Sequence, residues 1–415
     1  MTLQADCDLV LGFARVLFIN GQSTEQTVAA AEQLAKTLGF RAEILPRWGQ
    51  VQLKVEGQDG SLYSEVADPT GIDMQRVATA MSMSATMEAG RLAPDSAVSA
   101  IKAIAKAPPL PTGLFTLAAA AGAVALAVIF GVEHLAPSGL ILLSAAAGAV
   151  VRRALARRTA NVFVQPFCAA LLAGIVGGLA VRYDLSSSLR LVAVCPCMVL
   201  VPGPHLLNSA LDLANGRIHL GAARLLYALL VVVAISTGLL LGLTLLGVSL
   251  PVDPVGRAVP LWQDVIAAGV AVFAYSVFFS TPLRMLPWPI AIGMLAHALR
   301  WAALSVIGMG ATSGALVACL VVGTILTPVS HRRHMPFAAI GFASVVSLIP
   351  GVYLFRMASG LVQIATGSRG LADLLSETVA SGMTALNIIL AMSLGLIVPR
   401  MLIGSAYGRP QSGRT

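Results

Sequence analysis

The chain has 415 residues, of which 57% are hydrophobic and only 11% are charged, and its mean hydropathy is +0.84. Soluble domains carry about a quarter of charged residues, so this composition predicts a protein of the lipid bilayer. The formal net charge of +8 does not indicate nucleic-acid binding, because most basic residues after position 110 flank apolar runs, where they act as topology signals.

The first part of the chain, 1–108, is predicted to form a small soluble α/β domain. Its sequence alternates helical and strand patterns. In chain order these are a helix ending at Gly21, a helix over 25–38, a hairpin around Trp48-Gly49, a strand over 62–66 and helices over 73–89 and 94–106. Three prolines in Pro108-Pro109-Leu110-Pro111 cannot lie inside a helix and therefore end the domain.

Ten apolar runs of about 20 residues follow, the length that a bilayer requires. Five belong to a first membrane module, 112–250, and five to a second, 260–405. The expected spans are 113–131, 138–154, 161–181, 190–212, 220–247, 262–281, 287–306, 311–330, 336–357 and 373–399. The fold class is thus a polytopic α-helical membrane protein with an N-terminal α/β domain.

The distribution of basic residues predicts the orientation. With the N-terminal domain inside, twelve Arg after position 110 lie on the inner side and six on the outer side, with clusters at 152–158 and 332–333. This asymmetry favours N- and C-termini in the cytoplasm.

Two Pro-Gly breaks interrupt apolar runs, one at Pro202-Gly203-Pro204 and the other 148 residues later at Pro350-Gly351. Backbone groups freed by such breaks survive at membrane depth only where they are buried in protein or line a cavity. With five spans in each half, the second half enters the membrane from the opposite face. The spacing therefore predicts a 5+5 inverted repeat with a substrate site between the broken helices.

Several stretches resemble the threonine/serine exporter family of bacteria over nearly the whole chain. They read NGQSTEQTVAAAEQLAKTLGF, AGRLAPDSAVSAIKAI, FVQPFCAALLAGIVGGLA, LVPGPHLLNSALDLANG and HRRHMPFAAIGFASVVSLIPGVYLFRMASGL. The resemblance implies a multi-pass protein of the bacterial inner membrane that exports L-threonine and L-serine by proton antiport. A two-chain branch of the family is associated with succinate, which leaves a dicarboxylate as the alternative substrate. The chain departs from the family pattern at Thr112 and Gly113, where an aromatic and a basic residue are common, and at His205, where a small or apolar residue is common.

The residues after the first break are candidates for the transport pathway. Pro202, Gly203 and Pro204 free the backbone, and His205, Asn208 and Asp212 follow at i, i+3 and i+7 on one helix face. His205 and Asp212 are the candidates for proton coupling, since both are ionisable groups in an apolar run. The alternative for Asp212 is that it marks the helix end and pairs with Arg217 or Arg224.

The second break offers an equivalent set. Pro350 and Gly351 form the break, and Tyr353 and Arg356 stand 148 residues after His205 and Asn208. Arg356 would hold a carboxylate with a fork of donors, or alternatively extend to the membrane surface. Asn161 and Gln165 open the third span, where interhelical hydrogen bonding is the competing role. The lone His297 is expected to be a packing residue.

Other functions are disfavoured. The chain has no GxxxxGK[ST] motif for ATP, no histidine within 1–108 for a Ser-His-Asp triad, and five cysteines without a familiar metal spacing. No enzyme activity, cofactor, metal or nucleic acid is therefore expected; the partners are a small-molecule substrate, protons and membrane lipid, with a homo-oligomer left open. The competing classes are a channel and a membrane-embedded hydrolase or sensor using His205 and Asp212.

Overall fold

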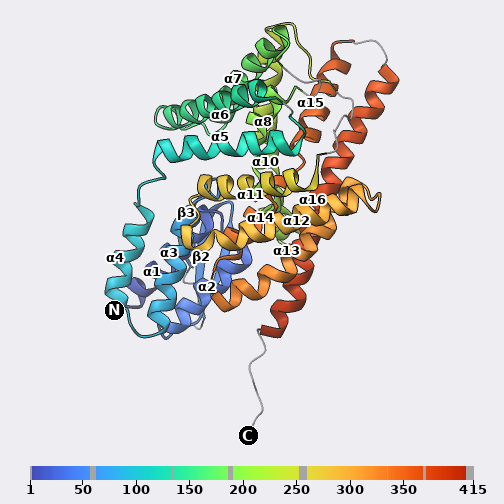
Figure 1. The fold of residues 1–415 in the computed structure, drawn as a ribbon. Helices are drawn as coiled ribbons and strands as arrows, with labels where there is room; N and C mark the ends of the chain where they lie inside the picture. Colours follow the sequence, from blue (N-terminus) through green and yellow to red (C-terminus); the bar gives the residue numbers. More distant parts are fainter. Residues whose placement is uncertain are drawn as a thin grey trace.

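The computed structural model describes residues 2–56, 62–132, 134–185, 190–251, 259–333, 335–367 and 371–407 (Figure 1). Within these ranges the chain is mostly helical, and its three strands all lie before residue 68. The predicted α-helical membrane class is therefore confirmed in its coarse form.

The N-terminal segment, defined here as residues 2–105, combines four helices with one three-stranded sheet. Its elements are α1 (Leu3–Ile19), α2 (Thr24–Thr37), β1 (Ala42–Arg47), β2 (Gly49–Val55), β3 (Leu62–Ala67), α3 (Met74–Glu88) and α4 (Pro94–Ala105). The sheet is antiparallel in the order β1-β2-β3, and Ala42 is paired with Val55. The turn between β1 and β2 places Gly49 at φ +87°, a conformation that favours glycine. Residues such as Leu9, Phe13 and Leu53 are fully buried in a core that lies almost entirely within this segment.

Among the described residues, seven later helices are long and apolar enough to cross a membrane. They are α5 (Thr112–Ile129), α6 (Leu135–Ala156), α7 (Val164–Arg182), α10 (Ile218–Thr244), α11 (Leu261–Phe278), α13 (Ala311–Arg333) and α16 (Leu371–Tyr407). Two bent pairs raise the number of spans to as many as nine. The seventh expected span coincides with α12 (Pro287–Ser305), which is not among these helices, so the total of ten stays a prediction.

The two bent pairs contain the two Pro-Gly breaks. In the first, α8 (Leu191–Met198) meets α9 (Gly203–Ala214) at 54°. In the second, the short elements η2 (Ala338–Phe342), α14 (Ala343–Val345) and η3 (Val346–Leu348) meet α15 (Gly351–Ala365) at 53°. η2 is a π-helical turn, a local irregularity that is frequent at functional sites. A short 3₁₀ turn, η1 (Leu283–Met285), precedes α12.

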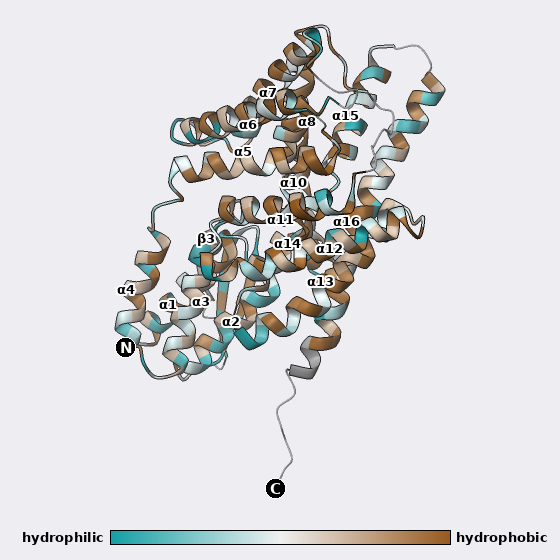
Figure 2. Ribbon diagram, viewed as in Figure 1, coloured by the Kyte–Doolittle hydropathy of each residue, from teal (hydrophilic) through white to brown (hydrophobic). Residues whose placement is uncertain are grey.

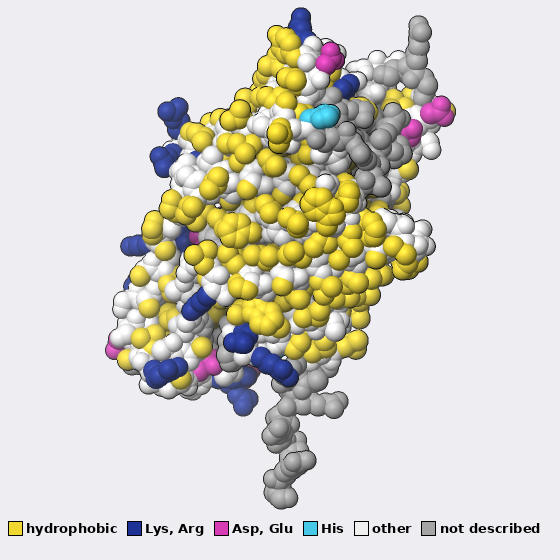
Figure 3. All heavy atoms as spheres, in the orientation of Figure 1, with side chains coloured by type: hydrophobic (Ala, Val, Ile, Leu, Met, Phe, Trp, Pro, Cys, Tyr) yellow, Lys and Arg dark blue, Asp and Glu magenta, His cyan; other side chains and the backbone are white. Residues whose placement is uncertain are grey.

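The surface and the packing agree with a bilayer environment. Apolar residues run along the helices outside the N-terminal segment (Figure 2). In Figure 3, yellow side chains cover the middle of the face, and most Lys and Arg side chains lie at its left and lower edges. Between helices, small residues allow close backbone approach: a Cβ on Gly323 would lie 2.8 Å from the carbonyl oxygen of Gly395, where α13 packs against α16.

The N-terminal segment is fixed to one end of the membrane helices by polar contacts. The backbone N–H of Met74 donates to the carbonyl of Phe279 at 2.9 Å, and Arg400 pairs with Glu25 at 3.1 Å. The rings of Trp48 and Tyr227 lie 5.4 Å apart. The same end of the helices also holds the cavity described next.

Candidate functional site

A cavity of about 340 Å³ lies beside the first break, between the membrane helices and the N-terminal segment. Its volume falls within the range of small-molecule sites. Several separate regions of the chain line the cavity. The N-terminal segment contributes the loop 70–73, and the membrane helices contribute the start of α5 at Phe115, the end of α6 at Arg152 and Arg153, and the start of α7 at Gln165 and Pro166. The break from Val199 to His205, Tyr227 and the end of α11 also contribute.

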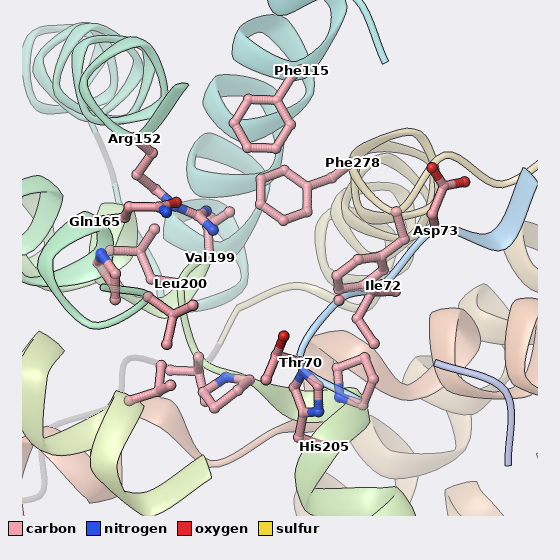
Figure 4. A pocket seen from close by; sticks show the side chains of 18 of the residues that line it. Thr70, Ile72, Asp73, Phe115, Arg152, Gln165, Val199, Leu200, His205 and Phe278 are labelled. Carbon is pink, nitrogen blue, oxygen red and sulfur yellow. The ribbon is translucent and has the colours of Figure 1, made fainter. Parts of the chain in front are cut away.

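Arg152 and Arg153 both line this cavity, and Figure 4 shows the side chain of Arg152. The better-placed of the two is Arg152. Its guanidinium lies 5.7 Å from the ring centroid of Phe115 and 5.4 Å from that of Phe278, and these two rings stack at 4.5 Å. The Nε atom of Arg152 is buried and has no hydrogen-bond partner among the described residues. Arg153 lies 4.2 Å from the centroid of Phe115. Aromatic faces thus hold a guanidinium whose donors remain available to an anion.

The break also leaves backbone acceptors without donors, on residues that line the cavity. In a continuous α-helix, the carbonyl of Leu200 would accept a hydrogen bond from the N–H of residue 204. In a 3₁₀ turn, the carbonyl of Val199 would accept one from the N–H of residue 202. Both donors are missing, because residues 202 and 204 are prolines. The remaining N–H, that of Gly203, donates to Val201 at 2.8 Å. No described group donates to the carbonyls of Val199 or Leu200, which lie at the negative C-terminal end of α8.

The two breaks have the same backbone conformation. Pro202 has φ −80° and ψ 61°, and Pro350 has φ −78° and ψ 49°, values close to those of an inverse γ-turn. Each is closed by the N–H of the following glycine, which donates to the residue before the proline at 2.8 Å. The γ-turn interrupts the helical backbone at the proline. The direction of the chain therefore changes sharply at both breaks.

The two breaks also contact each other. A Cβ on Gly203 would collide with Cδ1 of Ile349, and a Cβ on Gly351 would lie 3.2 Å from Cγ of Met198 and 3.5 Å from Cγ2 of Val201. Since 349 and 351 stand 148 residues after 201 and 203, these contacts are reciprocal. The kinked segments therefore lie side by side within the protein.

The first-half residues named from the sequence divide into two groups. Pro202, Pro204, His205 and Gln165 line the cavity, whereas Gly203 faces Ile349. Asn161 is exposed, and its Oδ1 accepts from the N–H of Phe163 at 2.9 Å, which is a local capping contact at the start of α7. Asn161 is therefore placed outside the cavity lining.

His205, Asn208 and Asp212 do share one helix face, and that face contacts the N-terminal segment. The ring of His205 donates to the backbone of Thr70 and lies 5.1 Å from the ring of Tyr227. Asn208 donates to the carbonyl of Gly21 at 3.2 Å, and Asp212 accepts from Thr24 at 3.0 Å.

Asp212 is also the centre of a buried ion-pair cluster. Its Oδ2 lies 2.9 Å from Nη1 of Arg224, and its Oδ1 lies 3.7 Å from Nη1 of Arg217. Both side chains of the Asp212–Arg224 pair are 2% exposed. The alternative role weighed for Asp212, pairing at the helix end, is the arrangement observed.

The second-half residues are not in the cavity lining. Pro350 caps α15, and Gly351 packs against the first break. Tyr353 is half-buried and packs against the cores of both halves, and Arg356 is buried.

Two features were missed by sequence reasoning. Arg152 was interpreted as a topology signal, although it falls within the expected span 138–154. His297 was expected to be a packing residue, and it is fully buried, but its polar partners were not predicted: its Nδ1 lies 3.0 Å from Oδ2 of Asp264 and its Nε2 lies 2.8 Å from Oγ of Ser347. The available signal was Asp264, an acidic residue inside an apolar span, which is a functional suspect by default.

Seven to nine apolar spans, two apposed helix breaks and a guanidinium-lined internal cavity define a polytopic helical membrane protein with the features of a transporter. A family model described as "Putative threonine/serine exporter" matches residues 8–246, and a second, "Threonine/Serine exporter, ThrE", matches residues 264–402. The chain belongs to the threonine/serine exporter family. It is 26% identical to a "Probable threonine/serine exporter" of Mycobacterium tuberculosis (strain ATCC 25618 / H37Rv), over 98% of this chain and 78% of that protein. No solved structure matches.

Proposed function

We propose that this chain is a secondary transporter that exports L-threonine and L-serine in exchange for protons, with the cavity as its inward-facing substrate site. The observation that carries the proposal is that one small cavity is lined both by Arg152 and by Val199 and Leu200, the two residues of the first break whose carbonyls lack donors. The names of the matching families and of the mycobacterial relative agree with this substrate class.

The binding mode follows from the chemistry of an amino acid, which presents a carboxylate and an ammonium group. The guanidinium of Arg152 would receive the carboxylate, because its fork of donors matches two carboxylate oxygens. The carbonyls of Val199 and Leu200 would receive the ammonium, because they lie at the negative end of a helix dipole and lack other donors. Gln165 and His205 also line the cavity.

An inverted repeat would provide the alternating access. The elements α5, α6, α7, α8, α9 and α10 each have a counterpart that begins within five residues of a 148-residue offset: α11, α12, α13, η2, α15 and α16. Packing partners repeat as well, since α7 packs against α10 as α13 packs against α16. Five crossings per half would invert the second half, and the common offset supports that arrangement.

The outward-facing state would then use the second break. Tyr353 and Arg356 follow Pro350 and Gly351 as His205 and Asn208 follow Pro202 and Gly203. We infer that these second-half residues would line an outward cavity when the inward one closes. The inner side is assigned to the N-terminal segment, because Arg152, Arg153 and the exposed Arg157 and Arg158 cluster at that end of α6. Both termini would be cytoplasmic, and the membrane would be the bacterial inner membrane.

A dicarboxylate such as succinate is the second candidate substrate. It is favoured by one observation, the presence of two guanidinium groups, Arg152 and Arg153, on the same cavity wall and against the same Phe115 ring. A dicarboxylate would use both, whereas an amino acid needs only one.

Transport by the purified full chain in proteoliposomes tests the proposal. Vesicles loaded with labelled L-serine, L-threonine or succinate are given a pH gradient, and release is followed against protein-free liposomes. Faster release of serine and threonine when protons can enter in exchange is the expected result. Release of succinate alone would replace the substrate, and release that ignores the gradient would contradict antiport.

A further inference from the structure

Three side chains from separate elements of the second half form a buried hydrogen-bonded chain. Asp264 comes from the first turn of α11, His297 from the middle of α12 and Ser347 from η3. The distances are 3.0 Å from Nδ1 of His297 to Oδ2 of Asp264 and 2.8 Å from Nε2 to Oγ of Ser347. His297 is 0% exposed, Asp264 4% and Ser347 6%.

This arrangement can accept one proton while both contacts of the His297 ring are kept. An ionised Asp264 only accepts hydrogen bonds, so Nδ1 of a neutral His297 carries the hydrogen and Nε2 accepts from the hydroxyl of Ser347. An added proton binds to Nε2, which then donates to Oγ of Ser347 while the hydroxyl hydrogen turns away. The group of three thereby changes from a net charge of −1 to 0.

The location connects this site to the second break. Ser347 lies three residues before Pro350, and its counterpart 148 residues earlier is Val199, which lines the cavity. The N–H of Met74 fixes the far end of α11 at Phe279, and 15 residues of helix place Asp264 about 22 Å away from that end. The cavity lies between the paired breaks and the N-terminal segment. The buried site lies on the other side of the breaks, in the equivalent position of the second half.

The elements packed against the site contribute few other ionisable groups. η2, α14, η3 and α5 carry none among their residues. The remaining packed elements carry Tyr275 on α11, Arg300 on α12, Arg284 on η1, and Cys319, His331, Arg332 and Arg333 on α13. Arg300 lies one turn after His297 and is the nearest cation along the chain. It stands 148 residues after Arg152 and is therefore the counterpart of the residue assigned to the substrate carboxylate.

We propose that Asp264, His297 and Ser347 form the proton-carrying site of the transporter, which loads when the second break opens to the outer side and unloads when the first break opens inward. This inference rests on the proposed function and specifies its coupling site. Movement of η3 relative to α12 must lengthen or remake the contact between Ser347 and His297, so protonation of the ring is linked to the state of the break. The site lies apart from the substrate cavity, whose lining includes none of its three residues.

Two transport modes of the full-length chain in proteoliposomes separate coupling from substrate binding. One is exchange of labelled for unlabelled L-serine at equal pH on both sides, and the other is accumulation of L-serine driven by a pH gradient. His297→Gln and Asp264→Asn are expected to keep exchange and to lose accumulation. His219→Gln is the matched control, because His219 is an exposed histidine at the start of α10, and it should retain both modes.

A binding measurement covers the case in which a variant folds poorly in liposomes. Protein in weakly buffered detergent solution is mixed with L-serine, and proton release is followed with a pH-sensitive dye. Wild type and His219→Gln should release protons, and His297→Gln should not. Ser347→Ala keeps both ionisable groups, and the pH midpoint of its exchange should shift.

Several results would overturn the site. Accumulation by His297→Gln at the wild-type level, an unmoved midpoint in Ser347→Ala, or covalent labelling of Ser347 by a fluorophosphonate would each do so, the last because it indicates a hydrolase. Wild-type protein that exchanges serine but ignores the gradient would also remove the site. Failure of the wild type to transport serine, threonine or succinate in any mode would instead reject the proposed function.

Discussion

The two helix breaks share a backbone and differ in what surrounds them. Pro202 and Pro350 adopt nearly the same φ and ψ, and the glycines after them close the same hydrogen bond at 2.8 Å. The first break faces a cavity that contains Arg152. The second is flanked by a sealed chain of Asp264, His297 and Ser347.

The difference lies in a few side chains and not in the helices. The counterparts of Asp264, His297 and Ser347 in the first half are Thr116, Ala149 and Val199, none of which is ionisable. Of these three counterparts, Val199 lines the cavity at the first break, whereas Asp264, His297 and Ser347 are joined in one buried hydrogen-bonded chain. Under the proposed mechanism, one half receives the solute and the other the proton, although the backbone of both is alike.

The largest expected effect concerns the buried carboxylate of the first half, Asp212. Asp212→Asn leaves the guanidinium of Arg224 buried without its anion, which costs about 3–5 kcal/mol. The comparison assigns this residue a structural role, so thermal melting in detergent should fall sharply while any remaining transport keeps its dependence on pH. Asp373→Asn, at an exposed position of α16, is the control and should melt like wild type. If Asp212→Asn lost the dependence of transport on pH without losing stability, the first half would carry the proton in place of the second.

Substitution of Arg152 is expected to be second in size. Arg152→Gln should weaken binding of serine by about 2–4 kcal/mol, because a charge-assisted contact is lost. Stability should fall by less than this, since Nε has no hydrogen-bond partner and only the contacts with Phe115 and Phe278 are lost. The half-saturating serine concentration for exchange measures this. Arg158→Gln, on the exposed surface six residues further along the chain, should leave it unchanged. Equal effects of both substitutions would indicate that the charge acts only on orientation in the membrane.

The sequence predicted the elements well because each depends on a local pattern. Apolar runs place the membrane helices, and the Pro-Gly pairs place both breaks to the residue. The polar face of His205, Asn208 and Asp212 was also predicted, but its partners were not. Gly21, Thr24 and Thr70 stand more than 130 residues away in the chain, and no local pattern records that they dock there.

The same limit explains the missed residues. Arg152 has the spacing of a topology signal, and only the tertiary packing of Phe115 and Phe278 shows that its guanidinium turns inward. Asp264 and His297 are 33 residues apart on different helices, so their contact follows from the packing of α11 against α12. Helical periodicity describes one face of one helix and carries no information about which helix covers it.

The contact between the breaks can be tested by a double substitution of intermediate effect. Gly203→Ala places a Cβ against Cδ1 of Ile349 and should cost about 1–3 kcal/mol of stability. Ile349→Val removes that atom, so the double variant should recover part of the loss. Gly351→Ala meets Met198 at 3.2 Å, a flexible neighbour, and should cost less. Additive losses in the double variant, measured by melting, would mean that the breaks do not contact each other.

The smallest expected effect is at Asp73, where the N-terminal segment forms the rim of the first cavity. Burial raises the pKa of Asp73 above its ordinary value of 3.8, and this outweighs the opposing hydrogen bond and charge of Arg76. A carboxyl group with a raised pKa in the folded state binds its proton more tightly there, so its contribution to stability is present at low pH and is lost as pH rises through the raised value.

Asp73→Asn keeps an acceptor for the N–H of Arg76, which Asp73 caps at 3.2 Å, and removes the titration. The variant should therefore match wild type near pH 4 and be slightly more stable at pH 7, by less than about 1 kcal/mol. Melting curves over this range measure the difference, with the exposed Asp95→Asn as the control. A variant that is less stable than wild type at pH 7 would mean that the charge of Asp73 stabilises the rim of the first cavity, so that an ionised carboxylate would support the first break as well as the second.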